Sequence, residues 1–200
     1  MITLVRSELY RMATIRSSWV SISLFGAVAA AFGMLDAYWW ALFVGIGAFG
    51  ISVLTVAQHY QHRTIALLYL ARPRRLSVLI AQVITTVAVA WCFAAVTGIA
   101  VVIKGGDRPY LHTLIVVPVM AAFGTAAAAI VRRSSWLFFG FAAWFVFVEG
   151  LAGQLKWPLP ISSYLNAAGG DAFGLEVFVG WAVVALAVAV LTLARDLTAD

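Results

Sequence analysis

The chain has 200 residues, of which 64% are hydrophobic and 10% carry a charged side chain. Its mean hydropathy is +1.01. Ordinary globular proteins carry about a quarter charged residues, and a domain of this size has too little interior to bury so much apolar surface. The composition therefore excludes a soluble domain and predicts a protein whose main solvent is lipid.

The net charge of +5 would point to nucleic acid in a soluble protein. Here the basic residues stand in short clusters between long apolar runs, so membrane topology accounts for them better than nucleic-acid binding. The single cysteine, Cys92, lies inside an apolar run, and we expect it to be a small packing residue. His59 and His62 lack a third ligand for zinc, so no metal site is expected.

Residues 2–15 predict an amphipathic helix at the start of the chain. Ile2, Val5, Leu9 and Met12 share one helical face, and polar and charged side chains lie mostly on another. Charged residues interrupt the segment too often for it to cross a bilayer. We therefore expect this helix to lie in the membrane interface.

Runs of about 20 apolar residues mark transmembrane helices. Pro118 predicts a kink in the fourth of them. The predicted fold is an all-α integral membrane protein, a single domain over residues 1–200, with six spans and a short cytoplasmic helix between the second and third. The spans are expected at about 17–35, 37–57, 76–103, 111–131, 136–155 and 175–194.

Six spans place both termini on the same side of the membrane. Ten of the 13 lysine and arginine residues then lie on that side. The other three, Lys104, Arg108 and Lys156, lie on the opposite side. Because basic residues accumulate in cytoplasmic loops, both termini are expected in the cytoplasm.

Glu149 is the clearest ionisable residue deep inside a predicted span. It follows Trp136 by 13 residues, which places it about 20 Å into the fifth span. A charge at that depth is costly and should face the protein interior or a wet cavity. Two roles fit it: a group in a substrate pathway or its gate, or a structural partner that orients the chain near the broken outer segment.

Residues 58–75, between the second and third spans, are too long for a minimal turn and are rich in arginine. Residues 64–70 predict a short helix, with Thr64 as its N-cap. Its apolar side chains, Leu67 and Leu68 among them, would be surrounded by arginines. An apolar knob with a basic rim fits a docking site for another protein, and it fits equally an interfacial segment anchored to anionic lipid.

Two stretches carry a resemblance to one transporter family. His59–Ile65 followed by Leu70–Arg75 is similar to a Glu-Tyr-Arg-x-Gly-Thr-like run, a short helix and a Pro-Arg turn. Trp144–Leu151 followed by Leu159 and Pro160 resembles a fifth-span pattern of tryptophan and glutamate with a Leu-Pro after it. With the amphipathic helix and six spans, the whole chain resembles the membrane (permease) subunit of a bacterial type-2 ABC exporter.

The resemblance implies that two permease subunits assemble with two separate ATP-binding subunits in the bacterial plasma (inner) membrane. This chain would then be no enzyme and would hold no cofactor, because the partner subunit binds ATP and Mg. The short helix would dock in a groove of the ATPase, and residues 150–173 would form partly re-entrant outer helices that cap the pathway. The coupling residues would be Arg63, Thr64, Leu67, Leu68, Arg72, Arg74 and Arg75.

Two positions depart from the family pattern: His59 stands where an acidic residue is common, and Arg63 where glycine is common. The departures leave a heterodimer open beside a homodimer. A non-ABC membrane accessory protein and a stand-alone secondary transporter are the alternative functions, and the scarcity of charge in the spans counts against the second. The apolar span walls suit hydrophobic or amphipathic cargo, but lipid-facing surface has the same composition, so the substrate stays open.

Overall fold

The computed structural model describes residues 2–61 and 75–195, and the regular structure within those ranges is helical throughout. Helix ends lie within four residues of the predicted ends. The elements are α1 (Ile2–Thr14), α2 (Arg16–Gly33), α3 (Ala37–Gln61), α5 (Arg75–Thr97), α6 (Ile99–Ile103), α7 (Asp107–Val131), α8 (Ser134–Ala143), the π-helix η1 (Trp144–Ala152), α9 (Pro160–Ala168) and α10 (Ala172–Arg195).

Five helical segments of the described chain are long and apolar enough to cross a membrane: α3, α5 with α6, α7, α8 with η1, and α10. A sixth span results if α1 and α2 are taken together, and these two helices meet at a bend of 77°. The 18 residues of α2 measure about 27 Å, slightly less than the roughly 30 Å hydrocarbon core. The chain is thus an all-helical, multi-pass membrane protein.

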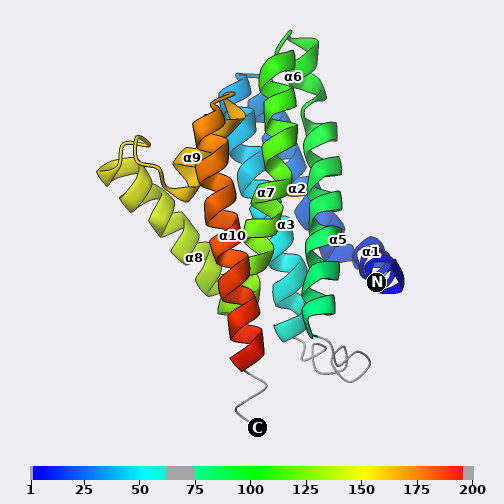
Figure 1. Ribbon diagram of the computed structural model, residues 1–200. Helices are drawn as coiled ribbons and strands as arrows, with labels where there is room; N and C mark the ends of the chain where they lie inside the picture. Colours follow the sequence, from blue (N-terminus) through cyan, green and yellow to red (C-terminus); the bar gives the residue numbers. More distant parts are fainter. Residues whose placement is uncertain (1, 62–74, 196–200) are drawn as a thin grey trace.

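Helix α3 lies at the centre of the bundle, with α2 on one side and α7 on another (Figure 1). Of its most apolar 18-residue window, 83% is buried, compared with 6% for the segment formed by α8 and η1. Figure 1 shows α8 rising from the end of α7 and diverging from the other helices. The fifth span therefore lies at the edge of the subunit, with most of its surface uncovered.

The predicted third span is divided at Gly98 into α5 and α6. A Cβ atom at Gly98 would lie 2.4 Å from the Trp40 ring and 2.6 Å from the Tyr110 ring. These two rings stack with their centroids 5.8 Å apart. Glycine is required here because the backbone of the third span passes directly against an aromatic pair from α3 and α7.

Pro118 lies inside α7, which continues through it. Proline has no N–H, so the carbonyl four residues earlier, that of Leu114, loses its helical partner. The indole Nε1 of Trp91 on α5 donates to the Leu114 oxygen at 3.1 Å. In a bilayer, where water does not reach such a carbonyl, Trp91 makes proline tolerable at this position.

Cys92 corrects the sequence-based expectation, because its side chain is exposed on the outside of the bundle. The neighbouring Phe93 and Ala94 are buried. On this helix they occupy the inward face, which turns Cys92 away from the protein interior.

Gly124 brings α7 against α3. A Cβ atom added there would lie 3.1 Å from Ser52 Cβ and 3.2 Å from the Phe49 carbonyl oxygen. Because one of these neighbours is backbone, a methyl group can be accommodated only if the two helices separate. Small residues have this role in membrane helix pairs.

We predict that Gly124→Ala lowers the stability of the detergent-solubilised protein by about 1–3 kcal/mol, the usual cost of overpacking. Gly180 on α10 is the matched control, since a Cβ there meets nothing within 4 Å. Thermal unfolding of Gly124→Ala and Gly180→Ala measures the difference. Equal midpoints for the two variants would show that the contact between α7 and α3 is not tight.

Candidate functional site

The proposed coupling residues fall mostly outside the described part of the chain. Arg63, Thr64, Leu67, Leu68, Arg72 and Arg74 lie between residues 61 and 75. Arg75 is the first residue of α5. The structure describes instead the two helix ends that flank this segment, and it shows what holds one of them.

The last turns of α3 are bound to the N-terminal helix by a buried polar cluster. The Glu8 carboxylate of α1 lies 3.0 Å from His59 Nε2 of α3. Arg11 donates to the same Glu8 oxygen at 3.1 Å, to the Thr55 carbonyl at 3.0 Å and to Gln58 Oε1 at 3.3 Å. These contacts fix α1 to the end of α3 that leads into residues 62–74.

The cluster buries part of the polar face of α1, which an amphipathic helix would normally expose. Glu8 belongs to the polar face of α1, yet it is 5% exposed, whereas Leu9 on the apolar face is 39% exposed. Burial alone raises the pKa of the Glu8 carboxyl. The hydrogen bonds and charges of His59 and Arg11 outweigh that effect, so the pKa lies below its ordinary value of 4.5.

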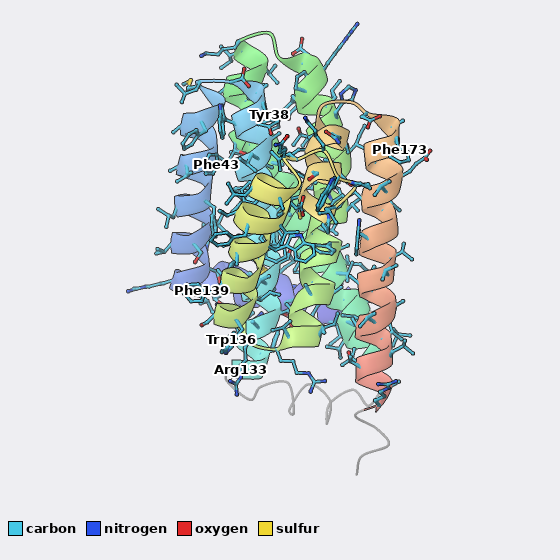
Figure 2. All side chains as sticks on the ribbon, turned by 90° about the vertical axis from the view of Figure 1, so that its left-hand side faces the viewer. Tyr38, Phe43, Arg133, Trp136, Phe139 and Phe173 are labelled. Carbon is cyan, nitrogen blue, oxygen red and sulfur yellow. The ribbon has the colours of Figure 1, made fainter. Side chains whose placement is uncertain are left out.

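Glu149 forms the second polar centre and is fully buried. Its Oε1 accepts hydrogen bonds from Trp144 Nε1 at 2.8 Å and from the Ile161 N–H at 3.1 Å. Its Oε2 accepts from both the Ser162 N–H and the Ser162 hydroxyl, each at 2.6 Å. Figure 2 views the bundle from the side on which α8 lies.

Glu149, which belongs to η1, caps the N-terminus of the separate helix α9. Helix α9 begins at Pro160, which has no N–H, and Leu159 before it makes no side-chain cap bond. The next two N–H groups, of Ile161 and Ser162, both point to Glu149. The carboxylate therefore satisfies the otherwise unpaired donors of α9 and complements the positive end of its dipole.

The π-helix explains how Trp144 reaches Glu149. The two residues are five apart, which in an α-helix is about 1.4 turns and places them on different faces. A π-helix pairs residues five apart, and η1 runs from Trp144 to Ala152. The irregular turn of the fifth span thus presents the carboxylate to α9 and adds an indole donor to it.

Helix α9 in turn reaches the centre of the bundle. Eight of its residues are buried, and Tyr164 is 1% exposed. The Tyr164 hydroxyl donates to the Ala41 carbonyl of α3 at 2.8 Å. The segment expected at 150–173 as partly re-entrant outer helices consequently contains, between η1 and α10, the short helix α9, which is inserted against α3, α7 and α10.

The two polar centres differ in how far they can be predicted from the sequence. Glu149 is conspicuous as a lone acid in an apolar run, but its partners lie 12 and 13 residues away and cannot be read from it. The cluster of Glu8, Arg11 and His59 was missed. The available signal was a histidine at 59 where the family that the chain resembles commonly has an acid, together with an acid, Glu8, in the N-terminal helix.

Comparisons with protein-family models, with curated protein sequences and with solved structures find no match to this chain. Within residues 2–61 and 75–195, no three histidine, cysteine or acidic side chains converge where they could hold a metal ion. What the described chain offers chemically is thus two satisfied polar centres that position helices. The pathway role considered for Glu149 stays a prediction.

We predict that Glu149→Gln destabilises the fold by about 1–3 kcal/mol, because its amide N–H₂ would face donors and leave at least one of them without an acceptor. Glu176→Gln is the control, since Glu176 is an exposed acid on α10. Thermal unfolding and protease resistance of residues 153–159 report the effect. A variant as stable as the control but altered in transport would favour the pathway role instead.

The stability of the fold should depend on pH through Glu8. A lowered pKa in the folded state means that ionised Glu8 stabilises the fold above pH 4.5, and that this contribution is lost as the pH falls through the lowered pKa. Wild type should exceed Glu8→Gln by about 2 kcal/mol at pH 7. The gap between the two unfolding midpoints should narrow as the pH falls below 4.5, and a gap that does not narrow with acidification would contradict the assignment.

Proposed function

We propose that this chain is the permease subunit of an ATP-driven exporter of the type-2 ABC class, located in the bacterial plasma membrane with both termini in the cytoplasm. A separate subunit would bind ATP and Mg and dock on residues 62–74. A second permease copy, identical or different, would complete the transporter. The proposal rests on the resemblance described above and on one structural observation.

That observation is a continuous set of contacts from one end of the bundle to the other along α3. Helix α3 ends at Gln61, directly before the proposed docking segment, and its last turns carry α1 through Glu8 and Arg11. Near its other end, Ala41 receives the Tyr164 hydroxyl of α9. A force applied to the docking segment would therefore reach both the N-terminal helix and the inserted outer helix.

The described spans also favour a subunit that is driven by a separate ATPase over a transporter that works alone. Ion- or proton-driven transport requires titratable groups inside the spans. Apart from the paired Glu8 and His59 at the end of α3, Glu149 is the buried acid of the described spans, and its oxygens are already engaged by four donors. A carboxylate engaged in this way positions α9, and this structural use of the buried acid favours a subunit driven by a separate ATPase.

We predict that mild-detergent purification from the native host recovers a P-loop ATPase at about one copy per permease. Reversing the charge of Arg72, Arg74 and Arg75 together with Leu67→Asp should abolish that association, because the docking surface loses both its apolar knob and its basic rim. Circular dichroism should show unchanged helix content.

The control is Arg108→Glu with Lys156→Glu, two basic residues at the opposite end of the bundle, which should retain the ATPase. A chain that elutes without any ATPase would overturn the proposal and leave an accessory membrane protein or a solitary transporter. Retention of the ATPase by the docking variant would overturn the assignment of the segment alone.

A further inference from the structure

An apolar cleft of about 300 Å³ separates the fifth span from the body of the bundle. Phe49 of α3 and Phe123 and Ala127 of α7 form one wall, and Gly140 and Phe141 of α8 face them. Phe49 and Phe141 stack with their centroids 3.9 Å apart and hold α8 to α3. The hollow exists because Ala127 and Gly140 are small, and a Cβ at Gly140 would meet nothing within 4 Å.

The two ends of the cleft are chemically different. Pro160, at the start of α9, closes the end near Glu149. Val131 and Trp136 line the other end, on either side of the connection between α7 and α8. That connection contains Arg132 and Arg133, and the Arg133 side chain is exposed. Figure 2 shows Arg133 and Trp136 together at this end of α8.

The position of the arginines relative to the bilayer follows from the spans. Both α7 and the segment formed by α8 and η1 are long and apolar enough to cross the membrane. The connection between them must therefore lie at the membrane surface, where lipid headgroups are found. The cleft thus runs from headgroup level into the hydrocarbon, with positive charge at its mouth and apolar walls inside.

We propose that this cleft binds one acyl chain of an anionic membrane lipid whose headgroup lies at Arg133. An empty hollow of this size inside a bilayer would forfeit the dispersion contacts of its walls. An apolar cavity of about 150 Å³ holds a benzene ring, so about 300 Å³ accommodates a chain segment on the order of ten carbons. The arginine at the mouth selects an anionic headgroup over a zwitterionic one.

A second copy of the chain is a poorer occupant of the cleft. In a twofold dimer formed through this face, the same patch meets itself. Arg133 of each copy would then border the same interface at the same depth as Arg133 of its partner, and like charges placed together across an interface are unfavourable. The charge at the mouth therefore favours an anionic lipid, and the proposal does not depend on the exporter function.

Native mass spectrometry of the detergent-purified chain, incubated with phosphatidylglycerol or phosphatidylcholine, tests the proposal. We expect one phosphatidylglycerol to be retained and phosphatidylcholine to be retained more weakly. Gly140→Leu should reduce phosphatidylglycerol binding by about tenfold, because excluding even two methylene groups from the cleft costs that much affinity. Gly180→Leu, an equally open glycine outside the cleft, should bind as wild type does.

A second variant tests the headgroup contact without filling the cleft. Arg133→Gln should weaken phosphatidylglycerol binding about fivefold, whereas Arg16→Gln, another exposed arginine of the described chain, should not. Unfolding midpoints of all four variants confirm that they are folded.

Three results would each overturn the proposal. The first is equal retention of the two lipids by the wild-type chain. The second is wild-type binding by Gly140→Leu. The third is a lipid-free dimer that Gly140→Leu dissociates, which would identify a second copy as the occupant.

Discussion

The structure depends on the requirement that every backbone polar group inside a bilayer has a partner. Regular helices meet this requirement alone, and two irregular points of the described bundle meet it with a side chain. Trp91 donates a hydrogen bond to the Leu114 carbonyl, which Pro118 leaves without a helical partner. Glu149 accepts hydrogen bonds from the first N–H groups of α9. The two side chains lie where a proline removes a backbone hydrogen bond: Pro118 inside α7, and Pro160 at the start of α9.

The expectation of a multi-pass helical protein is confirmed, because it rests on long apolar runs that no other structure could bury. Helix ends followed from charges and prolines to within four residues. The need for glycine at position 98 could not be foreseen, since the rings of Trp40 and Tyr110 that lie against it are distant in the chain. Periodicity within one segment carries no information about such contacts.

The candidate site was predicted less completely than the fold. A lone acid in an apolar run, such as Glu149, indicates a buried polar centre. One of its two predicted roles was a structural partner near the outer segment, and its hydrogen bonds to the start of α9 are of that kind. Which donors it meets depends on the π-helix and on the return of α9, neither of which has a distinct sequence signature. Glu8 was assigned to the polar face of the first helix, and amphipathicity assumes that such side chains contact water. In the structure the Glu8 carboxylate contacts His59 and Arg11 instead.

The bond between Glu8 and His59 has a consequence for how the protein is made. Its two residues are 51 positions apart, so the N-terminal helix emerges long before its anchor. At about 5–20 residues per second, α1 is made several seconds before His59. The Glu8 carboxylate therefore has no histidine partner until the second span is complete, so the attachment of α1 to the bundle has to follow the synthesis of α3.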